Sequence, residues 1–215
     1  MLSIVKSMSL HGLDGYLVDV QVDISAGMPA WEVVGLPDTT VRESKERVRI
    51  AIRNSGFDFP SRKIIINLAP ADKRKEGSFF DLPIAIGILL DLLVIQEQNL
   101  SDTVFIGELS LDGSVNKVNG ILPMCIEAKK LGIKKAIIPK ENDVEASVVE
   151  GLEIIGVSSL KQVVSYLNGN EKIVSTKSNI EKIFSEKPKY TFDFAEVKGQ
   201  ENIKRALEVA AARRA

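Results

Sequence analysis

A run of basic side chains that could bind phosphate groups lies between residues 39 and 55. Its cations recur three or four positions apart, so on a helix they would form one stripe beside an apolar face. The charged turn at 72–76 adds three cations, where a surface loop could reach a nucleic-acid backbone. Aromatic residues are sparse near these cations, so we expect contacts with phosphates rather than stacking of bases. The candidate nucleic-acid-binding residues are Arg42, Lys45, Arg49, Arg53, Lys73, Arg74 and Lys75.

The same charges have a second interpretation, a solvated surface held by ion pairs. Acidic residues are interspersed with the cations in both segments, and most charged helix faces pair in this way. The chain has 28 basic and 29 acidic residues and a net charge of −1, so any contact with DNA must be local. The sequence leaves both interpretations open. The acidic residues concerned are Glu43, Glu46, Asp72 and Glu76.

Residues for metal, nucleotide or covalent chemistry are few. The single Cys125 and the single His11 cannot form a disulfide or a four-ligand zinc site, so we expect no metal site. No glycine is followed by lysine, so the sequence contains no Walker A phosphate loop. Ser3 and Lys6 have a Ser-x-x-Lys spacing, but on a strand they would point to opposite faces, out of hydrogen-bond reach. The sequence therefore offers no complete catalytic set.

The elements that would position these residues alternate along the chain. Residues 16–24 alternate between apolar and polar, which is the period of a half-buried strand. Residues 79–93 are apolar almost throughout, which predicts a helix buried between layers. Strands and helices continue to alternate up to residue 167, which indicates a mixed α/β domain. The other predicted elements are strands 30–35, 62–68, 103–111, 135–138 and 152–156, a hairpin return at 115–118, and helices at 39–55, 121–131, around 144, at 160–167 and at 201–214.

The composition changes after residue 168, where large apolar side chains become few. We therefore expect a domain over 1–168, a linker over 169–190, and a C-terminal segment over 191–215 with too little apolar surface to fold alone. The chain starts without the features of a signal peptide, and the apolar segment 82–95 is too short to cross a bilayer. We expect a soluble cytoplasmic protein with no membrane contact.

Several sequence motifs resemble one known family. They include VGLPD at 34–38, NSGF at 54–57, and the segment 67–86, which reads as a strand, a charged loop and a buried helix. Over essentially the whole chain these motifs are similar to the N-terminal ChlI-type domain of the ComM/YifB family, a group of magnesium-chelatase-related AAA+ ATPases. The resemblance implies the two-layer α/β fold of Lon proteases, which belongs to the ribosomal protein S5 domain 2-like group.

The resemblance to Lon also implies where a catalytic pair would lie. Active Lon proteases have a nucleophilic serine at the start of the buried helix and a lysine on a later helix. Gly77 and Gly120 match glycines of that pattern, which puts Phe79 at the serine position and Leu122 at the lysine position. Neither side chain can attack a carbonyl or accept a proton, so the resemblance implies a non-catalytic domain. Ser78 lies one residue away and leaves a remote alternative, a Lon-like serine peptidase.

The C-terminal segment resembles the lead-in to an AAA+ ATPase core. In that family the residues matching Val197, Gly199 and Gln200 lie beside the adenine, and the phosphate loop follows later in the chain. Because this sequence stops before such a loop, the resemblance implies ATP and Mg²⁺ for the full-length protein and no cofactor for this fragment. Residues 213–215 depart from the Gly-Gly-His continuation expected in the family.

The resemblance finally implies a role for the full-length protein, an ATP hydrolase that assembles as a hexameric ring and acts on DNA. In the ComM group the implied role is branch-migration helicase work in recombination during natural transformation. One alternative is a protein-interaction or ring-assembly module, with DNA handled by the ATPase core alone. Another alternative is a chelatase-like ATPase that remodels a partner enzyme. In each case this domain would be an accessory without its own catalysis.

Overall fold

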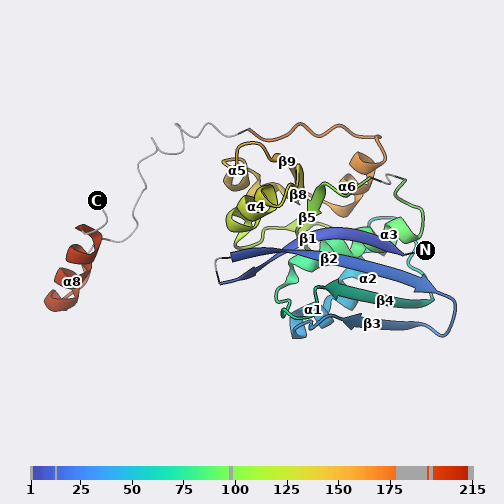
Figure 1. Ribbon diagram of the computed structural model, residues 1–215, viewed down its shortest axis with the longest axis horizontal. Helices are drawn as coiled ribbons and strands as arrows, with labels where there is room; N and C mark the ends of the chain where they lie inside the picture. Colours follow the sequence, from blue (N-terminus) through green and yellow to red (C-terminus); the bar gives the residue numbers. More distant parts are fainter. Residues whose placement is uncertain (1, 13, 97–98, 178–192, 194–195, 213–215) are drawn as a thin grey trace. The chain divides into compact units, whose positions relative to one another are not determined.

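The computed structural model describes residues 2–12, 14–96, 99–177, 193 and 196–212 (Figure 1). The chain divides into two compact units, Met1–Ser178 and Asn179–Ala215, and each is considered by itself. The first unit contains the sheet and all seven candidate nucleic-acid-binding residues. Most of the described residues of the second unit form one helix, α8 (Glu201–Ala212).

A seven-stranded mixed sheet forms the centre of the first unit. Its strands, in spatial order, are β3 (Ala30–Val34), β4 (Lys63–Ala69), β2 (Asp14–Ser25), β1 (Ser3–His11), β5 (Thr103–Phe105), β8 (Lys135–Pro139) and β9 (Glu153–Val157). Strand β2 runs antiparallel to both of its neighbours, whereas the other four pairings are parallel. The predicted mixed α/β fold is therefore confirmed, with a mostly parallel sheet. The predicted hairpin is formed by β6 (Glu108–Leu109) and β7 (Val115–Asn116).

Helices cover the sheet, and Figure 1 shows them grouped around it. They are α1 (Thr39–Arg42), α2 (Ser44–Asn54), η1 (Ser78–Phe80), α3 (Asp81–Asp91), α4 (Ile121–Lys130), η2 (Lys140–Asn142), α5 (Asp143–Ala146) and α6 (Leu160–Leu167). Alternate residues of β5, β8 and β9 belong to two apolar clusters, one with α2, α3 and α6 and one with α4 and α5. Two layers, as in the predicted fold, describe the β3–β4 edge of the sheet. The strands from β2 to β9 contribute side chains to both clusters, so that part of the sheet has helices on both faces.

Two predicted elements are interrupted, and in both cases a backbone group is bonded outside its own element. The predicted helix 39–55 is divided at Glu43 into α1 and α2, and the Thr40 carbonyl accepts a hydrogen bond of 3.0 Å from the Arg47 side chain. The predicted strand 103–111 is divided between β5 and β6. There the Gly107 N–H donates to the Phe79 carbonyl and the Gly107 carbonyl accepts from Leu82, each at 3.0 Å. These bonds tie the strand to the start of α3 and replace ladder bonds.

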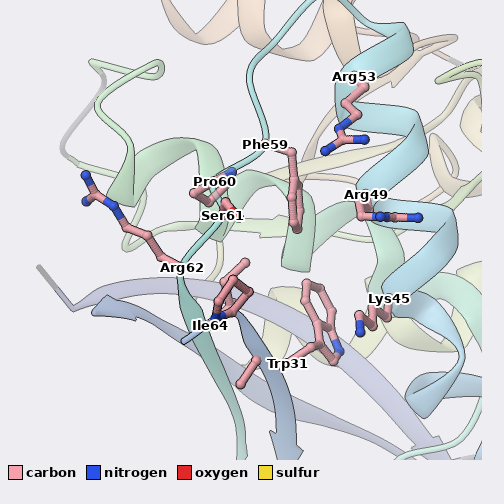
Figure 2. Close-up of a pocket in the computed structure, with 11 residues that line it drawn as sticks. Trp31, Lys45, Arg49, Arg53, Phe59, Pro60, Ser61, Arg62 and Ile64 are labelled. Carbon is pink, nitrogen blue, oxygen red and sulfur yellow. The ribbon is translucent and has the colours of Figure 1, made fainter. Parts of the chain in front are cut away.

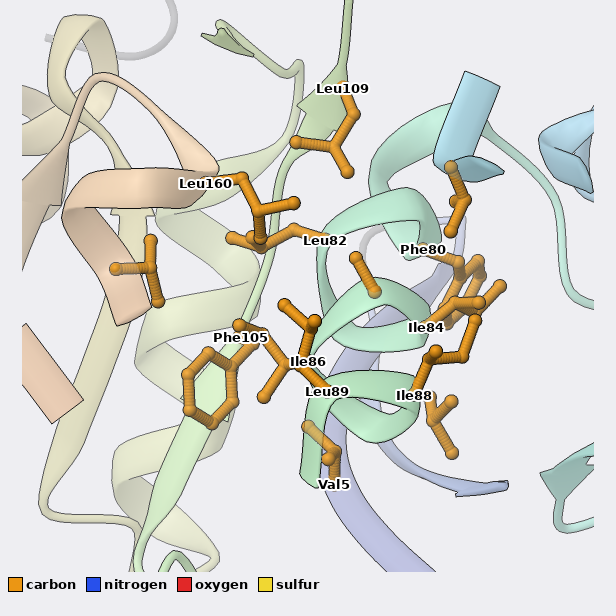
Figure 3. Close-up of a cluster of buried hydrophobic side chains, with 14 of the residues drawn as sticks. Val5, Phe80, Leu82, Ile84, Ile86, Ile88, Leu89, Phe105, Leu109 and Leu160 are labelled. Atoms are coloured by element: carbon orange, nitrogen blue, oxygen red, sulfur yellow. The ribbon is translucent and has the colours of Figure 1, made fainter. Parts of the chain in front are cut away.

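Helix α3 is the centre of the larger cluster, as its apolar sequence predicted. Every residue from Leu82 to Leu89 is buried, and Figure 3 shows their side chains extending in several directions from the helix. Burying one such leucine or isoleucine stabilises the fold by about 1.5–3 kcal/mol. A Cβ on Gly87 would lie 2.6 Å from the Val22 Cγ2, so this glycine lets the helix lie directly on strand β2. The sheet and α3 together form the core on which α2 and α6 pack.

The first compact unit continues beyond residue 168, where the sequence suggested a linker. The Thr176 N–H donates to the Ile154 carbonyl at 3.0 Å, and the Thr176 hydroxyl donates to Asp143 at 2.7 Å. Residues 178–190 of the predicted linker, and residues 213–215, lie outside the described part of the chain. Among the described helices, none is long and apolar enough to span a membrane.

Candidate nucleic-acid interface

Helix α2 carries three of the predicted cations on one side. Its apolar side packs into the core through Val48, Ala51 and Ile52. Lys45, Arg49 and Arg53 follow one another at intervals of four residues, so they share a stripe that borders this buried side. The expected helical stripe is present for these three residues. Arg42 belongs to α1 and is separated from them by the break at Glu43.

The stripe lines a surface pocket together with two aromatic rings that the sequence reasoning missed. Trp31 comes from β3 and Phe59 from the segment before β4, and Figure 2 shows both rings between residues 60–64 and helix α2. Their ring centroids are 6.4 Å apart, with an angle of 27° between the planes. The pocket has a volume of about 170 Å³. We call it the Trp31 pocket, and its principal side chains are Trp31, Lys45, Arg49, Arg53 and Phe59.

The parallel pairing of β3 with β4 accounts for this meeting. Trp31 lies opposite Ile64 in the ladder, which places the indole beside the residues that lead into β4. Phe59 is in that lead-in, and α2 packs over the same edge of the larger cluster. In the sequence, these two rings could have been noticed only as a tryptophan in a short predicted strand and a phenylalanine shortly before the next strand. The sequence alone did not place these rings beside the cations, because Trp31 precedes helix α2 in the chain and Phe59 follows it.

Ion pairing explains only part of the predicted cationic set. Arg49 pairs with Glu46 at 2.6 Å and Arg74 pairs with Glu76 at 3.3 Å. Within the described residues, Arg42, Lys45 and Arg53 have no acidic partner at ion-pair distance. Two of the seven candidate cations are therefore ion-paired, as the second interpretation of these charges expected.

A second, smaller basic site joins α1 to the charged turn. Arg42 and Arg74 line a shallow pocket with the residues 36–39. Backbone hydrogen bonds hold the two segments together, from the Asp38 N–H to the Lys75 carbonyl at 2.9 Å and from the Lys75 N–H to the Leu36 carbonyl at 3.1 Å. Arg42 and Arg74, which are far apart in sequence, are therefore adjacent here and form a site separate from the stripe of α2.

The other two lysines of the turn have different environments. The Lys73 ammonium lies 4.5 Å from the centroid of the Tyr16 ring and is exposed. Lys75 is 0% exposed, and its ammonium donates to the carbonyls of Pro70 and, at 2.8 Å, of Lys73. Burial lowers the pKa of Lys75, and the nearby Asp72 opposes that effect. Lys75 therefore holds its own turn together and does not reach a surface ligand, although its charge had suggested a phosphate contact.

The positions that correspond to the Lon catalytic pair lie in packed surroundings. The Phe79 ring contacts the Phe80 ring at a centroid distance of 4.7 Å and packs against both apolar clusters. Leu122 packs against the smaller cluster. The Ser78 hydroxyl donates to the Glu108 carboxylate, which also accepts from the Asn116 amide at 3.3 Å. The partner of Ser78 is thus a carboxylate that already has a second donor, and not a lysine amine.

A partly buried ion pair that the sequence did not indicate lies beside Ser78. The Arg47 guanidinium binds Asp81 at the start of α3 through two bonds, Nε to Oδ2 at 2.7 Å and Nη2 to Oδ1 at 3.0 Å. Asp81 is completely buried. Burial raises the pKa of Asp81 to about 6, even though Arg47 favours the ionised form. Arg47 comes from α2 but is turned toward α3, so it belongs to the core and not to the basic stripe.

The residues expected beside an adenine lie in the second unit. Val197 is 44% exposed, and both Gly199 and Gln200 have a positive φ before α8 begins. No residue of α8 is buried. Because the sequence contains no phosphate loop, these residues do not form a complete site for ATP in the described chain. The described residues also contain no cluster of three His, Cys, Asp or Glu that could hold a metal ion.

Comparison with known proteins identifies relatives along most of the chain. The family profile described as subunit ChlI of Mg-chelatase matches residues 20–142, more than half of the chain. Competence protein ComM of Haemophilus influenzae is 41% identical over 212 residues, which cover 98% of this chain and 42% of the relative. YifB of Escherichia coli is 38% identical over 219 residues, covering 98% of this chain and 41% of the relative. Lon protease 2 of Bacillus subtilis is 28% identical over 178 residues, covering 74% of this chain and 32% of the relative. The chain thus spans about two fifths of the length of ComM and YifB.

Proposed function

This chain belongs to the family of Mg-chelatase subunit ChlI, with ComM and YifB among its relatives, and on that premise we propose that it is a non-catalytic accessory domain of an ATPase that acts on DNA. Its own contribution is to hold the nucleic-acid backbone while a separate core uses ATP and Mg²⁺. For the full-length protein the proposal includes a hexameric ring in the cytoplasm. It also includes branch migration during recombination, in keeping with the word competence in the name of the Haemophilus relative.

The cationic stripe of α2 is the observation that supports this role. Three cations lie along one side of a helix whose other side is fixed in the core, so their spacing is set before any ligand arrives. Lys45 and Arg53 have no acidic partner among the described residues, which leaves their charges free to attract phosphate. Because this chain has a net charge of −1 and gains no general attraction to DNA, a local group of cations such as this stripe would provide its contact.

The surroundings of Ser78 support the non-catalytic part of the proposal. Acyl transfer needs a nucleophile whose proton passes to an adjacent base, together with donors aimed at the developing oxyanion. Glu108, the partner of Ser78, is also bonded to Asn116, and the position that matches the Lon lysine is the apolar Leu122. These residues stabilise a turn and a core, and the groups described around Ser78 do not include the lysine that the Lon pattern pairs with its serine.

Charge reversal of the stripe tests the proposed contact with DNA. The triple variant Lys45→Glu, Arg49→Glu and Arg53→Glu should bind DNA more weakly than the unchanged chain. Each lost phosphate contact should lower the slope of log affinity against log salt by about 0.7 for single strands and about 0.9 for duplex. The measurement is fluorescence anisotropy of labelled single-stranded, duplex and branched DNA at two salt concentrations.

A matched control keeps this result from being a simple effect of net charge. The variant Lys129→Glu, Lys130→Glu and Lys134→Glu changes the net charge by the same amount on exposed positions at the end of α4 and before β8. Its affinity should stay close to that of the unchanged chain. Equal losses in both triple variants, or no salt-sensitive binding by the unchanged chain, would contradict the proposed contact and favour a protein-interaction or ring-assembly module.

A further inference from the structure

The Trp31 pocket combines two kinds of surface that bind different parts of a nucleotide. On one side are the indole of Trp31 and the phenyl ring of Phe59, and on the other are the cations of α2. Figure 2 shows the Arg53 side chain extending from α2 toward Phe59. Arg62 also lines the pocket, but its guanidinium extends away from the two rings. Aromatic faces stack on bases and cations follow the phosphates, which is the combination found in proteins that bind single strands.

Two buried donors in this pocket have no acceptor within the described chain. They are the Trp31 Nε1–H and the Arg49 Nε–H. Buried donors in folded proteins are nearly always bonded, because an unsatisfied donor keeps the full cost of losing water. The Arg49 Nη2 donates to Glu46 at 2.6 Å, whereas its buried Nε has no partner among the described residues. The walls of the pocket therefore contain unsatisfied donors beside the stacking surfaces, and a rotation of the Trp31 or Arg49 side chain would let an acceptor of a ligand bond to them.

The size of the pocket narrows the class of ligand. Its volume of about 170 Å³ is smaller than the roughly 300 Å³ at which small-molecule sites usually begin. It therefore suits one flat group inserted from a longer molecule better than an enclosed metabolite. Lys45 and Arg53 are exposed at its rim, where they could bind the phosphates on either side of such a group.

We propose that the Trp31 pocket binds an unpaired nucleobase of a single-stranded nucleic acid, with the base against Trp31 and Phe59 and its flanking phosphates on Lys45 and Arg53. The inference rests on the proposed function and sharpens it, because it makes this domain select single strands over duplex. Paired bases in a duplex are stacked on one another and cannot enter the pocket without flipping out. A base that is already unpaired needs no such step.

Trp31 provides a direct probe, because it is the only tryptophan of the 215-residue chain. The chain is titrated with oligothymidylate, with an abasic oligonucleotide of the same length, and with a duplex, while tryptophan fluorescence and anisotropy are followed. Oligothymidylate should quench Trp31 and bind about 5- to 150-fold more tightly than the abasic strand, the range that corresponds to stacking of one base. The abasic strand has the same phosphates and should bind without strong quenching.

Two ring variants separate stacking from folding. Trp31→Phe keeps an aromatic face and should retain most of the preference for oligothymidylate over the abasic strand. Trp31→Leu should lose that preference while keeping salt-sensitive binding, with circular dichroism confirming the fold. If Trp31→Leu does not fold, Phe59→Leu serves the same purpose and keeps the fluorescent reporter.

The outcomes distinguish this inference from the proposed function. Equal affinity for oligothymidylate and the abasic strand, with binding that still weakens in salt, would overturn the base pocket and leave the backbone contact intact. An unchanged base preference in the folded leucine variants would also overturn it. Absence of binding to all three oligonucleotides would overturn both proposals.

Discussion

Two regions beside helix α2 differ in whether their polar groups have hydrogen-bond partners within the protein. We call the first the Ser78 region; it contains Ser78, Phe79, Asp81 and Glu108, and α2 supplies Arg47 to it. There the charged and hydroxyl groups bond to one another, and Phe79 packs with the core. In the Trp31 pocket, α2 supplies Arg49, and two buried donors have no acceptor among the described residues. Arg47 and Arg49 are two positions apart, so the side of the helix decides which role each arginine has.

Because of this difference, substitutions in the Ser78 region should affect the stability of the fold, and substitutions in the Trp31 pocket should affect ligand binding. Where polar groups satisfy one another inside the protein, a substitution should change the free energy of unfolding. Where they face a pocket, a substitution should change the affinity for a ligand and leave unfolding nearly unaffected. Substitutions in the two regions should therefore have effects of different kinds, and the largest is expected on stability.

Arg47→Ala should have the largest effect on stability. It leaves the buried Asp81 carboxylate without its partner, which typically costs about 3–5 kcal/mol. The pKa of Asp81 is already raised to about 6 by burial, and losing Arg47 should raise it further. Since a raised carboxylate pKa favours the folded state below that pKa, the loss should be largest near about pH 8 and smaller near about pH 5. Urea denaturation at both pH values measures this dependence.

Asp81 should also make the stability of the unchanged chain depend on pH. Folded Asp81 takes up a proton as the pH falls through about 6, whereas in the unfolded chain it stays ionised down to its ordinary value near 3.8. Acidification across that window therefore adds stability from this group, although other carboxylates contribute to the total. Arg49→Ala is the matched control, because its guanidinium pairs only at the surface. A loss of stability in Arg49→Ala as large as in Arg47→Ala would contradict the division between the two sides of α2.

Phe79→Ala should destabilise the fold by roughly 2–4 kcal/mol, somewhat below the range for a fully buried phenylalanine because the ring is only partly buried. The ring packs against both apolar clusters, so its removal leaves a gap between them. Affinity for DNA, measured by anisotropy under folded conditions, should stay unchanged. A selective loss of DNA affinity without a loss of stability would move Phe79 from the core to the interface.

Neutralising one cation at the rim of the Trp31 pocket should act on binding alone. Arg53→Gln should weaken binding of single-stranded DNA several-fold and lower the salt slope by about 0.7, with unfolding changed by less than about 0.5 kcal/mol. Lys130→Gln, an exposed cation on α4, is the control and should bind normally. Equal binding by Arg53→Gln and the unchanged chain would remove Arg53 from the proposed interface.

Ser78→Ala should show the smallest functional effect. The unchanged chain should hydrolyse no peptide, since the Ser78 hydroxyl donates to Glu108 and the Lon lysine position is Leu122. The variant should give the same background rate with a fluorogenic peptide substrate. Hydrolysis by the unchanged chain that disappears in Ser78→Ala would restore the serine-peptidase alternative.

Local patterns in the sequence predicted most of the elements. The alternation in β2 and the apolar run of α3 are direct consequences of burying one or both faces of an element, and both were recognisable without the structure. The breaks at Glu43 and Gly107 were not predicted, because each coincides with a backbone group that bonds outside its own element, to Arg47 of α2 in the first case and to η1 and α3 in the second. Periodicity describes one segment at a time and contains no information about such partners.

The candidate interface was predicted in part for the same reason. The spacing of Lys45, Arg49 and Arg53 was sufficient to place them on one side of a helix, and the structure places them there. The burial of Lys75 depends on carbonyls of its own folded turn, which its charge did not reveal. The pairing of Arg47 with Asp81 likewise depends on how α2 packs on α3.

The sequence by itself determined the alternation of strands and helices, the apolar core helix and the absence of a phosphate loop, since these depend on residue type and short-range spacing. Only the tertiary structure decided that Trp31 and Phe59 stand beside the cations of α2. The parallel pairing of β3 with β4 brings those rings to the helix, and that pairing is a contact between segments separated by α1 and α2. A binding surface built across such a contact follows from packing, because the free energy that forms it lies in the shared core rather than in any one segment.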